Sequence, residues 1–143
     1  MIFLWIDSRD SLYQNWLALR LRILREPLGL SFSPEDLAEE RDYLHLIAVE
    51  EDVILGGLTV IQINETSWKI RQVAVTKKVR GTGLGRELML KMESAARKER
   101  ITRLVLNSRV NVVPFYEKLD YRSVGEVFIE VKIPHQKMIS DLG

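Results

Sequence analysis

The sequence predicts one domain of mixed α/β class, and three observations support this. Segments with the apolar period of helices alternate with β-branched segments, in the order β-α-α-β-β-β-α-β-α-β. The length of 143 residues suits a single hydrophobic core and leaves little room for two. The chain contains no internal repeat, no Ser/Gly-rich linker and no low-complexity tract. Residues 1–143 are therefore expected to form one domain.

The N-terminal third is predicted to form one strand and two helices. Residues 2–6 are an apolar run that is too short for a signal peptide and has no basic segment before it, so we interpret them as a strand. Apolar residues then recur at helical spacing over residues 11–25, and Pro27 ends that helix. Ser33 is the expected N-cap of a second, short helix with Pro34 at its first position.

The rest of the chain is predicted to form five strands and two helices. Their β-rich composition places the strands at residues 44–49, 53–63, 68–75, 103–106 and 124–133. Hairpin turns are expected at residues 51–52 and 64–66. A long helix is indicated by apolar residues on one face, namely Leu84, Leu88, Met92 and Ala95. A short helix is expected at residues 111–119, and residues 134–143 follow the last strand as a tail.

Composition excludes several classes of function. The chain has 21 Lys and Arg against 20 Asp and Glu, a net charge of +1, whereas dedicated nucleic-acid binders are usually far more basic. The absence of cysteine excludes disulfide scaffolds, Cys-ligated zinc and a cysteine nucleophile, and we expect no metal. No stretch approaches the ~20 apolar residues of a membrane helix. We therefore expect a cytoplasmic protein with no nucleic-acid or membrane partner.

The near-neutral total conceals two segments of opposite charge. Residues 35–52 carry eight acidic side chains and one arginine, a net charge of −7. Residues 77–103 carry nine basic and three acidic side chains, a net charge of +6. We interpret the acidic segment as a solvated face in preference to a site that attracts a cationic amine. The basic segment is either a solvated face or an anion site, and the turn within it favours the second.

A glycine-rich turn follows the strand that ends at Val75. Residues 80–85 are Arg-Gly-Thr-Gly-Leu-Gly, and the long helix comes next. Glycine lets a backbone approach a ligand closely, and the unpartnered N–H groups of a helix start favour an anion. Arg86 follows Gly85 where an ATP or GTP site needs lysine, and the dinucleotide fingerprint is one residue short. The turn thus indicates a phosphate site of another kind.

Two motifs resemble those of the Gcn5-related N-acetyltransferases. Arg80, Gly83 and Gly85 fill the defined positions of motif A, R/Q-x-x-G-x-G/A. Residues 111–121, NVVPFYEKLDY, look like motif B, and they follow about thirty residues later with a predicted strand between. The resemblance extends over nearly the whole chain. It implies the acyl-CoA N-acyltransferase fold, a mixed and mostly antiparallel central sheet flanked by helices.

The resemblance also implies an activity. It implies an acetyl-CoA-dependent N-acetyltransferase whose acceptor is a primary amine of a small molecule or peptide. Without cysteine, an acetyl-cysteine route is impossible, and direct attack in a ternary complex remains. Two alternatives stay open: a non-catalytic acyl-CoA-binding or regulatory module, because no general base is obvious, and a nucleic-acid-binding domain that uses the basic segment. Many members of the family dimerise, so a homodimer is expected.

The resemblance assigns the cofactor to the turn and to the strand before it. Backbone N–H groups of residues 80–86 would hold the CoA pyrophosphate, residues 73–75 would pair with the pantetheine arm, and an N–H near Val75 would bind the oxyanion. Asn107 and Asn111 would bind cofactor amides, or else serve as strand-end and helix-cap residues. The expected cofactor residues are Val73, Ala74, Val75, Arg80, Gly81, Thr82, Gly83, Leu84, Gly85, Arg86, Asn107, Asn111 and Tyr116.

Two residues are candidates for catalysis. Tyr116 matches the motif B tyrosine and would protonate the leaving thiolate, unless it only packs beside Phe115. His135 is a candidate general base, since imidazole titrates near working pH, although a structural role is the alternative. His45 lies inside an apolar strand and is interpreted as packing. Asp120 replaces the usual motif B glycine and is expected in the left-handed conformation. Acceptor specificity would come from residues 20–42, 64–68 and 134–143.

Overall fold

The computed structural model describes residues 1–143 and contains seven strands and four α-helices. The strands are β1 (Ile2–Ile6), β2 (Leu44–Glu50), β3 (Val53–Asn64), β4 (Ser67–Val75), β5 (Arg103–Arg109), β6 (Arg122–Glu130) and β7 (Ile133–Asp141). The helices are α1 (Tyr13–Arg20), α2 (Pro34–Glu39), α3 (Leu84–Lys98) and α4 (Val113–Glu117). A π-helical turn, Leu21–Arg25, and a 3₁₀ turn, Glu26–Leu28, prolong α1.

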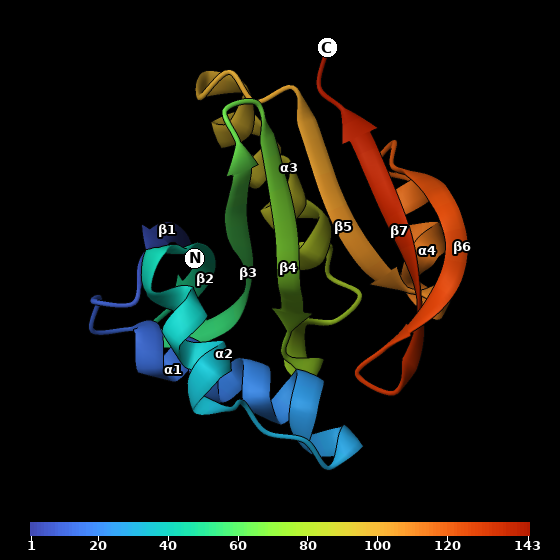
Figure 1. The fold of residues 1–143 in the computed structure, drawn as a ribbon. Helices are drawn as coiled ribbons and strands as arrows, with labels where there is room; N and C mark the ends of the chain where they lie inside the picture. The colour runs from blue at the N-terminus through green and yellow to red at the C-terminus, as the bar shows by residue number, and fades with distance from the viewer.

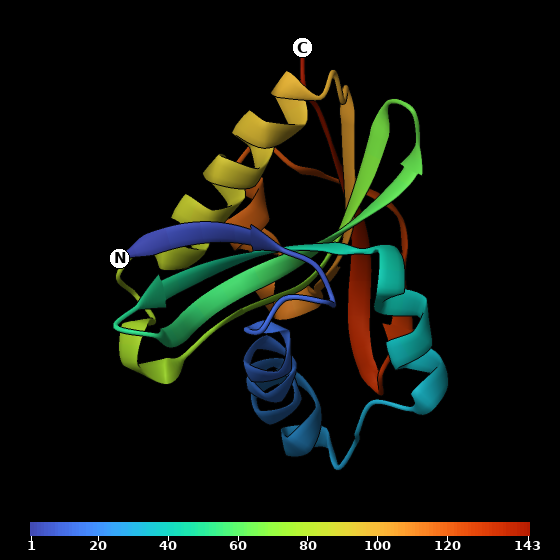
Figure 2. The ribbon, with the colours of Figure 1, turned by 90° about the vertical axis from the view of Figure 1, so that its left-hand side faces the viewer.

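All seven strands belong to one sheet with the order β1-β2-β3-β4-β5-β7-β6 (Figure 1). Every neighbouring pair is antiparallel except β4 and β5, which are parallel. The sheet twists strongly, with α3 and α4 on one face and α1 and α2 on the other (Figure 2). A hydrophobic cluster fills each face, the larger one under α3 and the smaller one under α1. The predicted mixed, mostly antiparallel sheet flanked by helices is confirmed.

The sheet opens between its two parallel strands. β4 and β5 pair only from Ser67 opposite Arg103 to Ile70 opposite Leu106, and no pairing continues beyond this point. A bulge in β4 begins there, because the register against β3 shifts and Gln72 has a φ of 58°. A bulge bends its strand and ends regular pairing, so it separates the remaining part of β4 from β5.

Two glycines of β3 let the neighbouring elements approach this bulge. A Cβ on Gly56 would lie 2.8 Å from the Val75 Cγ1, and one on Gly57 would lie 2.7 Å from the carbonyl oxygen of Leu46 and 2.9 Å from the Trp16 ring. These distances are shorter than real Cβ contacts. The absence of side chains at the two positions therefore decides how closely β2, β4 and α1 pack around β3.

The strand predicted at residues 124–133 is wrong in its extent. The chain turns at Val131 and Lys132, whose φ angles are 43° and 65°, and this turn divides the region into β6 and β7. Neither residue is a usual turn former, and Pro134 weakens the strand signal that follows. The tail expected at residues 134–143 is instead mostly β7, which inserts between β5 and β6.

Several local expectations are confirmed. Ser33 caps α2 in a capping box with Asp36, and the left-handed residues Glu51 and Asp52 connect β2 to β3. Asp120 adopts the expected left-handed conformation with a φ of 68°. The short helix is shorter than predicted: α4 spans Val113–Glu117 and follows a separate 3₁₀ turn, since Pro114 favours a helix start at this point.

Candidate active site

A cleft of about 960 Å³ occupies the opening between β4 and β5. Its walls come from β4, the last residues of β5, the π-helical turn after α1, and single residues of α4 and β7. Seven residues predicted from the sequence line it: Val73, Ala74, Val75, Arg80, Asn107, Tyr116 and His135. The fold thus brings both predicted catalytic residues and six of the thirteen predicted cofactor residues to one place.

The glycine-rich turn lies at the start of α3, next to the cleft wall formed by Arg80. Gly81 and Gly83 have φ angles of 81° and 89°, and no atom lies within 4 Å of an added Cβ at either position. Five N–H groups of this turn and helix start donate to no backbone carbonyl oxygen. They belong to Gly81, Gly83, Leu84, Gly85 and Arg86. An accessible row of unpaired donors at a helix start suits a phosphate group.

Unpaired polar groups also line the middle of the cleft. Successive N–H groups of a strand point to opposite sides. The Thr76 N–H donates to Leu55 O of β3, so the Val75 N–H points to the side of β5. The side-chain oxygens of Gln72 and Thr76 are buried and have no hydrogen-bond partner. A buried polar atom without a partner is costly, and an amide-containing ligand in the cleft would satisfy these atoms.

Tyr116 projects from α4 toward the cleft. The side chain is buried, its ring contacts Phe115 and Tyr121 edge-on, and no protein group hydrogen-bonds its hydroxyl. Burial disfavours the phenolate and raises the pKa of Tyr116 above its usual value of 10.0. The hydroxyl therefore remains protonated at neutral pH and is available as a hydrogen-bond or proton donor to a group in the cleft.

The two predicted asparagines have different surroundings. Asn107 is half-buried on β5 and lines the cleft. Asn111 is exposed in the 3₁₀ turn Val110–Val112 and lies outside the cleft lining. The alternative role of Asn111 as a helix cap is wrong, because Val112 is the N-cap residue of α4 and has no side-chain cap bond.

His135 lies at the start of β7, opposite Arg109 of β5, and is buried. Its Nδ1 is 2.7 Å from the carbonyl oxygen of Ile133, and a carbonyl only accepts, so Nδ1 carries the proton. The Nε2 atom is 3.8 Å from the Glu130 carboxylate, and the ring stacks on Phe128. The imidazole is thus held in one orientation at the cleft wall.

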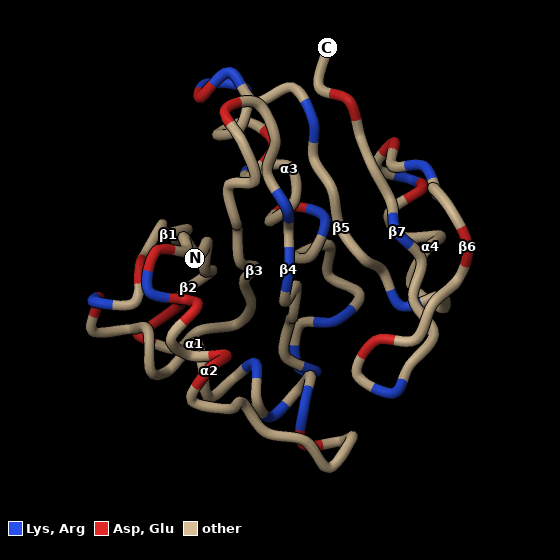
Figure 3. The backbone as a smooth tube through the Cα atoms, in the orientation of Figure 1, with Lys and Arg blue, Asp and Glu red and all other residues tan.

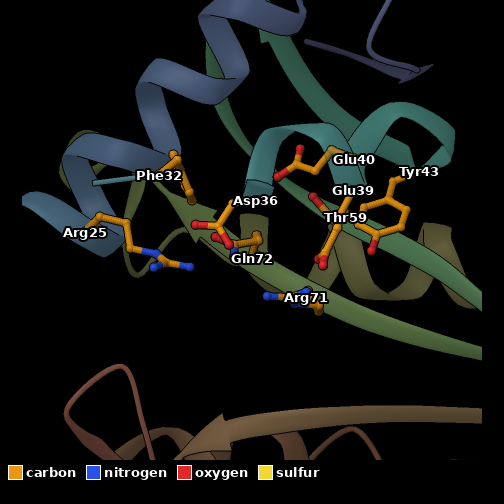
Figure 4. A pocket seen from close by; sticks show the side chains of 9 residues that line it. All are labelled: Arg25, Phe32, Asp36, Glu39, Glu40, Tyr43, Thr59, Arg71 and Gln72. Carbon is orange, nitrogen blue, oxygen red and sulfur yellow. The ribbon is translucent and has the colours of Figure 1, made fainter. Parts of the chain in front are cut away.

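A smaller pocket adjoins the cleft on the side of α2 (Figure 4). Arg25, Arg71 and Gln72 line both spaces, and the smaller one adds Phe32, Asp36, Glu39, Glu40, Tyr43 and Thr59. A backbone hydrogen bond from Ser33, helped by Arg25 and Arg71, lowers the pKa of Asp36. The acidic segment is therefore not simply a solvated face, since three of its members line this pocket. By contrast, residues 64–68, expected to contribute to specificity, line neither space.

A buried polar network beneath this pocket was not predicted. Arg20 donates to both carboxylate oxygens of Glu40 at 2.9 and 2.8 Å, and the Tyr13 hydroxyl donates to the same carboxylate at 2.8 Å. The His45 Nδ1 lies 2.8 Å from the Thr59 hydroxyl. Burial lowers the pKa of His45 to about 4. In the sequence, the one indication of this network is Arg20, a charged residue that directly follows the apolar helix position Leu19.

Two further features concern metals and membranes. No three His, Asp or Glu side chains are grouped so that they could hold a metal ion. None of the helices combines the length and the hydropathy needed to cross a membrane.

The mixed sheet, opened between parallel strands beside a glycine-rich helix start, defines the acyl-CoA N-acyltransferase class of fold. Residues 30–142 match a family model described as an acetyltransferase (GNAT) domain. The chain therefore belongs to the GNAT acetyltransferase family, as its two motifs predicted.

Relatives in Bacillus subtilis (strain 168) agree with this family. The uncharacterised N-acetyltransferase YjcF is 35% identical over 108 residues, which cover 75% of either chain. A second protein, which carries a provisional acetyltransferase name, is 30% identical over 97 residues. That match covers 68% of this chain and 65% of the relative, so this chain spans just under two thirds of that protein.

Solved structures confirm the fold. An acyl-CoA N-acyltransferase from Pseudomonas aeruginosa has a TM-score of 0.82 at 23% identity, covering 97% of this chain and 98% of its own. Escherichia coli ElaA has a TM-score of 0.84 at 19% identity, covering 98% and 99%. An aminoglycoside 6'-N-acetyltransferase solved with coenzyme A has a TM-score of 0.79 at 20% identity, covering 99% and 97%.

Proposed function

We propose that the protein is an acetyl-CoA-dependent N-acetyltransferase that acts on a primary amine by direct attack in a ternary complex. The observation that carries the proposal is the cleft between β4 and β5, where unpaired β4 backbone and the Tyr116 hydroxyl face the same space. Membership of the GNAT family supports the class of reaction. The neighbour solved with coenzyme A supports the same cofactor class for this fold.

The residues present fit coenzyme A. The unpaired N–H groups at the start of α3 would hold the pyrophosphate, with Arg80 and Lys77 supplying positive charge. The backbone groups of β4 beyond Ile70, which do not pair with β5, and the unpartnered side-chain oxygens of Gln72 and Thr76 would bind the amides of the pantetheine arm. When bound, acetyl-CoA supplies an activated acetyl thioester.

The chain's own groups then serve three chemical needs. The Val75 N–H, directed away from β3, would donate to the carbonyl oxygen as negative charge develops there. The protonated Tyr116 hydroxyl would give its proton to the departing thiolate. His135, with Nδ1 protonated and Nε2 free to accept, would take a proton from the amine, either directly or through water.

The test is release of CoA when acetyl-CoA is mixed with a panel of amines. The protein should release CoA with at least one amine, and Gly83→Glu should raise the Kd for CoA at least ~100-fold, because a carboxylate would occupy the phosphate position. Gly29→Glu is the matched control, since Gly29 also has a positive φ, 69°, and open space around it. Tight CoA binding without transfer to any amine would favour the non-catalytic module instead.

A further inference from the structure

Strand alternation assigns the polar residues of the cleft to one face of the sheet. On β4, Trp68 and Ile70 belong to the core under α3, so Lys69 and Arg71 point to the opposite face. On β5, Leu106 belongs to the same core, so Arg109 also points away from α3. These basic side chains therefore lie on the side of α1 and α2, across the sheet from the α3 helix start.

Five basic side chains collect on this side of the cleft, and we call them the basic wall. Its members are Arg22, Arg25, Lys69, Arg71 and Arg109. None of them forms an ion pair within 4.0 Å. Figure 3 shows basic positions along β4 and along the turn that follows α1. The one acidic residue lining the cleft is Glu130, which lies beside His135.

The acidic residues of the adjoining pocket offset only a small part of the charge of the basic wall. Asp36 accepts the Ser33 N–H at 2.9 Å as part of the helix cap, and Glu40 is held by Arg20 and Tyr13. Glu39 is exposed at the rim. Asp36 supplies one negative charge near Arg25 and Arg71, and Glu130 lies beside His135, so most of the positive charge of the basic wall is not compensated. Positive charges in a partly buried cleft repel one another and attract an anion.

Two members of the basic wall are held in place by their surroundings. The guanidinium of Arg25 stacks over the Phe32 ring at 4.9 Å, and that of Arg109 donates to the carbonyl oxygen of Leu24 at 3.5 Å. Figure 4 shows Arg25 and Arg71 beside Asp36 and Gln72, in the same part of the pocket. The phosphates of CoA do not account for these groups, because the proposed phosphate site is at the start of α3.

We infer that the acceptor amine carries an anionic group, a carboxylate or a phosphate, which the basic wall binds while the amine faces the opening between β4 and β5. This inference rests on the proposed function. It assigns the acceptor to the class of amino acids and amino phosphates, and not to the cationic amines that the acidic segment alone would attract.

Matched acceptors test the charge requirement. The kcat/KM for CoA release is compared for amino acids and their methyl esters, and for phosphoethanolamine and ethanolamine. An ester lowers the pKa of the neighbouring ammonium and so provides more neutral amine, so intrinsic reactivity favours the ester. A preference of at least tenfold for the anionic member of either pair supports the inference, and the preferred pair identifies the group. Equal rates, or faster reaction of the uncharged members, overturn it.

Variants connect the preference to named side chains. Arg71→Gln and Arg25→Gln should each raise KM at least about tenfold for the anionic acceptor, since each loses a charged hydrogen bond, with little change for its ester. Lys98→Gln is the matched control, because Lys98 is an exposed base at the end of α3, outside the cleft. Equal effects of Arg71→Gln on both acceptors would show a structural role and overturn the assignment.

A binding measurement separates this inference from the proposed function. N-acetyl amino acids should raise the Tm of the CoA-loaded protein, whereas their methyl esters should not, and Arg71→Gln should abolish the rise. If no amine is acetylated but this pattern holds, the proposed function fails and the anion site stands. If amines are acetylated and the Tm rise is absent or unaffected by Arg71→Gln, the function stands and the anion site fails.

Discussion

At the scale of single residues, burial keeps two titratable side chains neutral for different purposes. The Tyr116 hydroxyl lines the cleft without a protein partner, whereas His45 lies under the adjoining pocket and contacts Thr59. Desolvation raises the pKa of the tyrosine and lowers that of the histidine, because in each case it disfavours the charged form. The same physical cause thus supplies a candidate proton donor at the cleft and an uncharged support beneath it.

Replacing Tyr116 tests the proton donor. Tyr116→Phe keeps the ring contacts with Phe115 and Tyr121 but removes the hydroxyl. We expect kcat to fall by about 10²-fold or more, the usual range for a general acid, with the Kd for CoA nearly unchanged. The measurement is steady-state CoA release beside CoA titration. Full activity of the phenylalanine variant would reduce Tyr116 to a packing residue.

His45 gives the stability a defined dependence on pH. Its pKa is about 4 in the folded protein and 6.5 as the ordinary value, so below pH 6.5 the unfolded chain binds the proton more readily. The contribution of His45 is fully present above pH 6.5 and is lost as the pH falls toward 4, by up to about 3 kcal/mol. Arg20 reinforces this lowering of the pKa, and Glu40 opposes it.

The comparison is between the protein and His45→Gln, by urea unfolding from pH 7.5 to 4. Carboxylates titrate in both proteins and cancel in the difference. The free energy of unfolding should fall more steeply in the protein than in the variant below pH 6.5. Two parallel curves would show that His45 titrates normally in the folded state.

At the scale of secondary-structure elements, the bulge of β4 and the close packing around β3 lie at the point where the sheet opens. The bulge at Gln72 ends the pairing of β4 with β5. The glycines of β3 let Trp16 and the strand β2 pack closely against β3. The bulge of β4 lies opposite Gly57 to Thr59 of β3, so the tight packing at Gly57 adjoins the point where the sheet opens.

Adding one methyl group tests this packing. Gly57→Ala places a Cβ 2.7 Å from the Leu46 carbonyl oxygen, so we expect a loss of about 1–3 kcal/mol in the free energy of unfolding. Gly85→Ala is the matched change in α3, where the new Cβ would lie 3.5 Å from Phe115 and a gain in helix propensity is expected. Chemical denaturation measures both. Equal stabilities of the two variants would contradict a tight contact at Gly57.

At the scale of the whole molecule, β6 is an edge strand of the sheet. β6 pairs with β7 alone and exposes four apolar side chains: Val124, Val127, Phe128 and Ile129. An exposed apolar edge strand favours pairing with another strand. We propose that it pairs with β6 of a second copy, because an antiparallel pair of identical edges forms a closed twofold contact.

Sedimentation velocity tests the homodimer. The protein should sediment as a dimer, and Ile129→Lys should convert it to a monomer, because Ile129 is 68% exposed on this edge and a lysine there opposes pairing. Val53→Lys is the control, since Val53 is similarly exposed but lies at the β2–β3 hairpin. A monomer at every concentration of the unmodified protein would contradict the proposal.

Much of the fold could be predicted from the sequence because its signals are local. Helix periodicity, the cap at Ser33 and the glycines after Arg80 act within a few residues, and all of them lie where expected. The division between β6 and β7 could not be predicted, because the left-handed Val131 and Lys132 are held by strand pairing and not by a turn sequence. The alternative role of Asn111 as a helix cap was wrong because α4 starts two residues later, at Val113, with Val112 as its N-cap.

The sequence by itself determined the family, the element order up to β6 and the position of the glycine-rich turn before α3, because each depends on residues that are neighbours in the chain. Only the tertiary structure decided which polar residues share a space. Arg25 and Arg71 come from segments far apart in sequence and meet in one pocket, while Glu40 is drawn into the interior by Arg20. The sequence shows only how charged residues are distributed along the chain. A ligand in the cleft contacts charged side chains from several elements, and the fold alone decides which of them lie together.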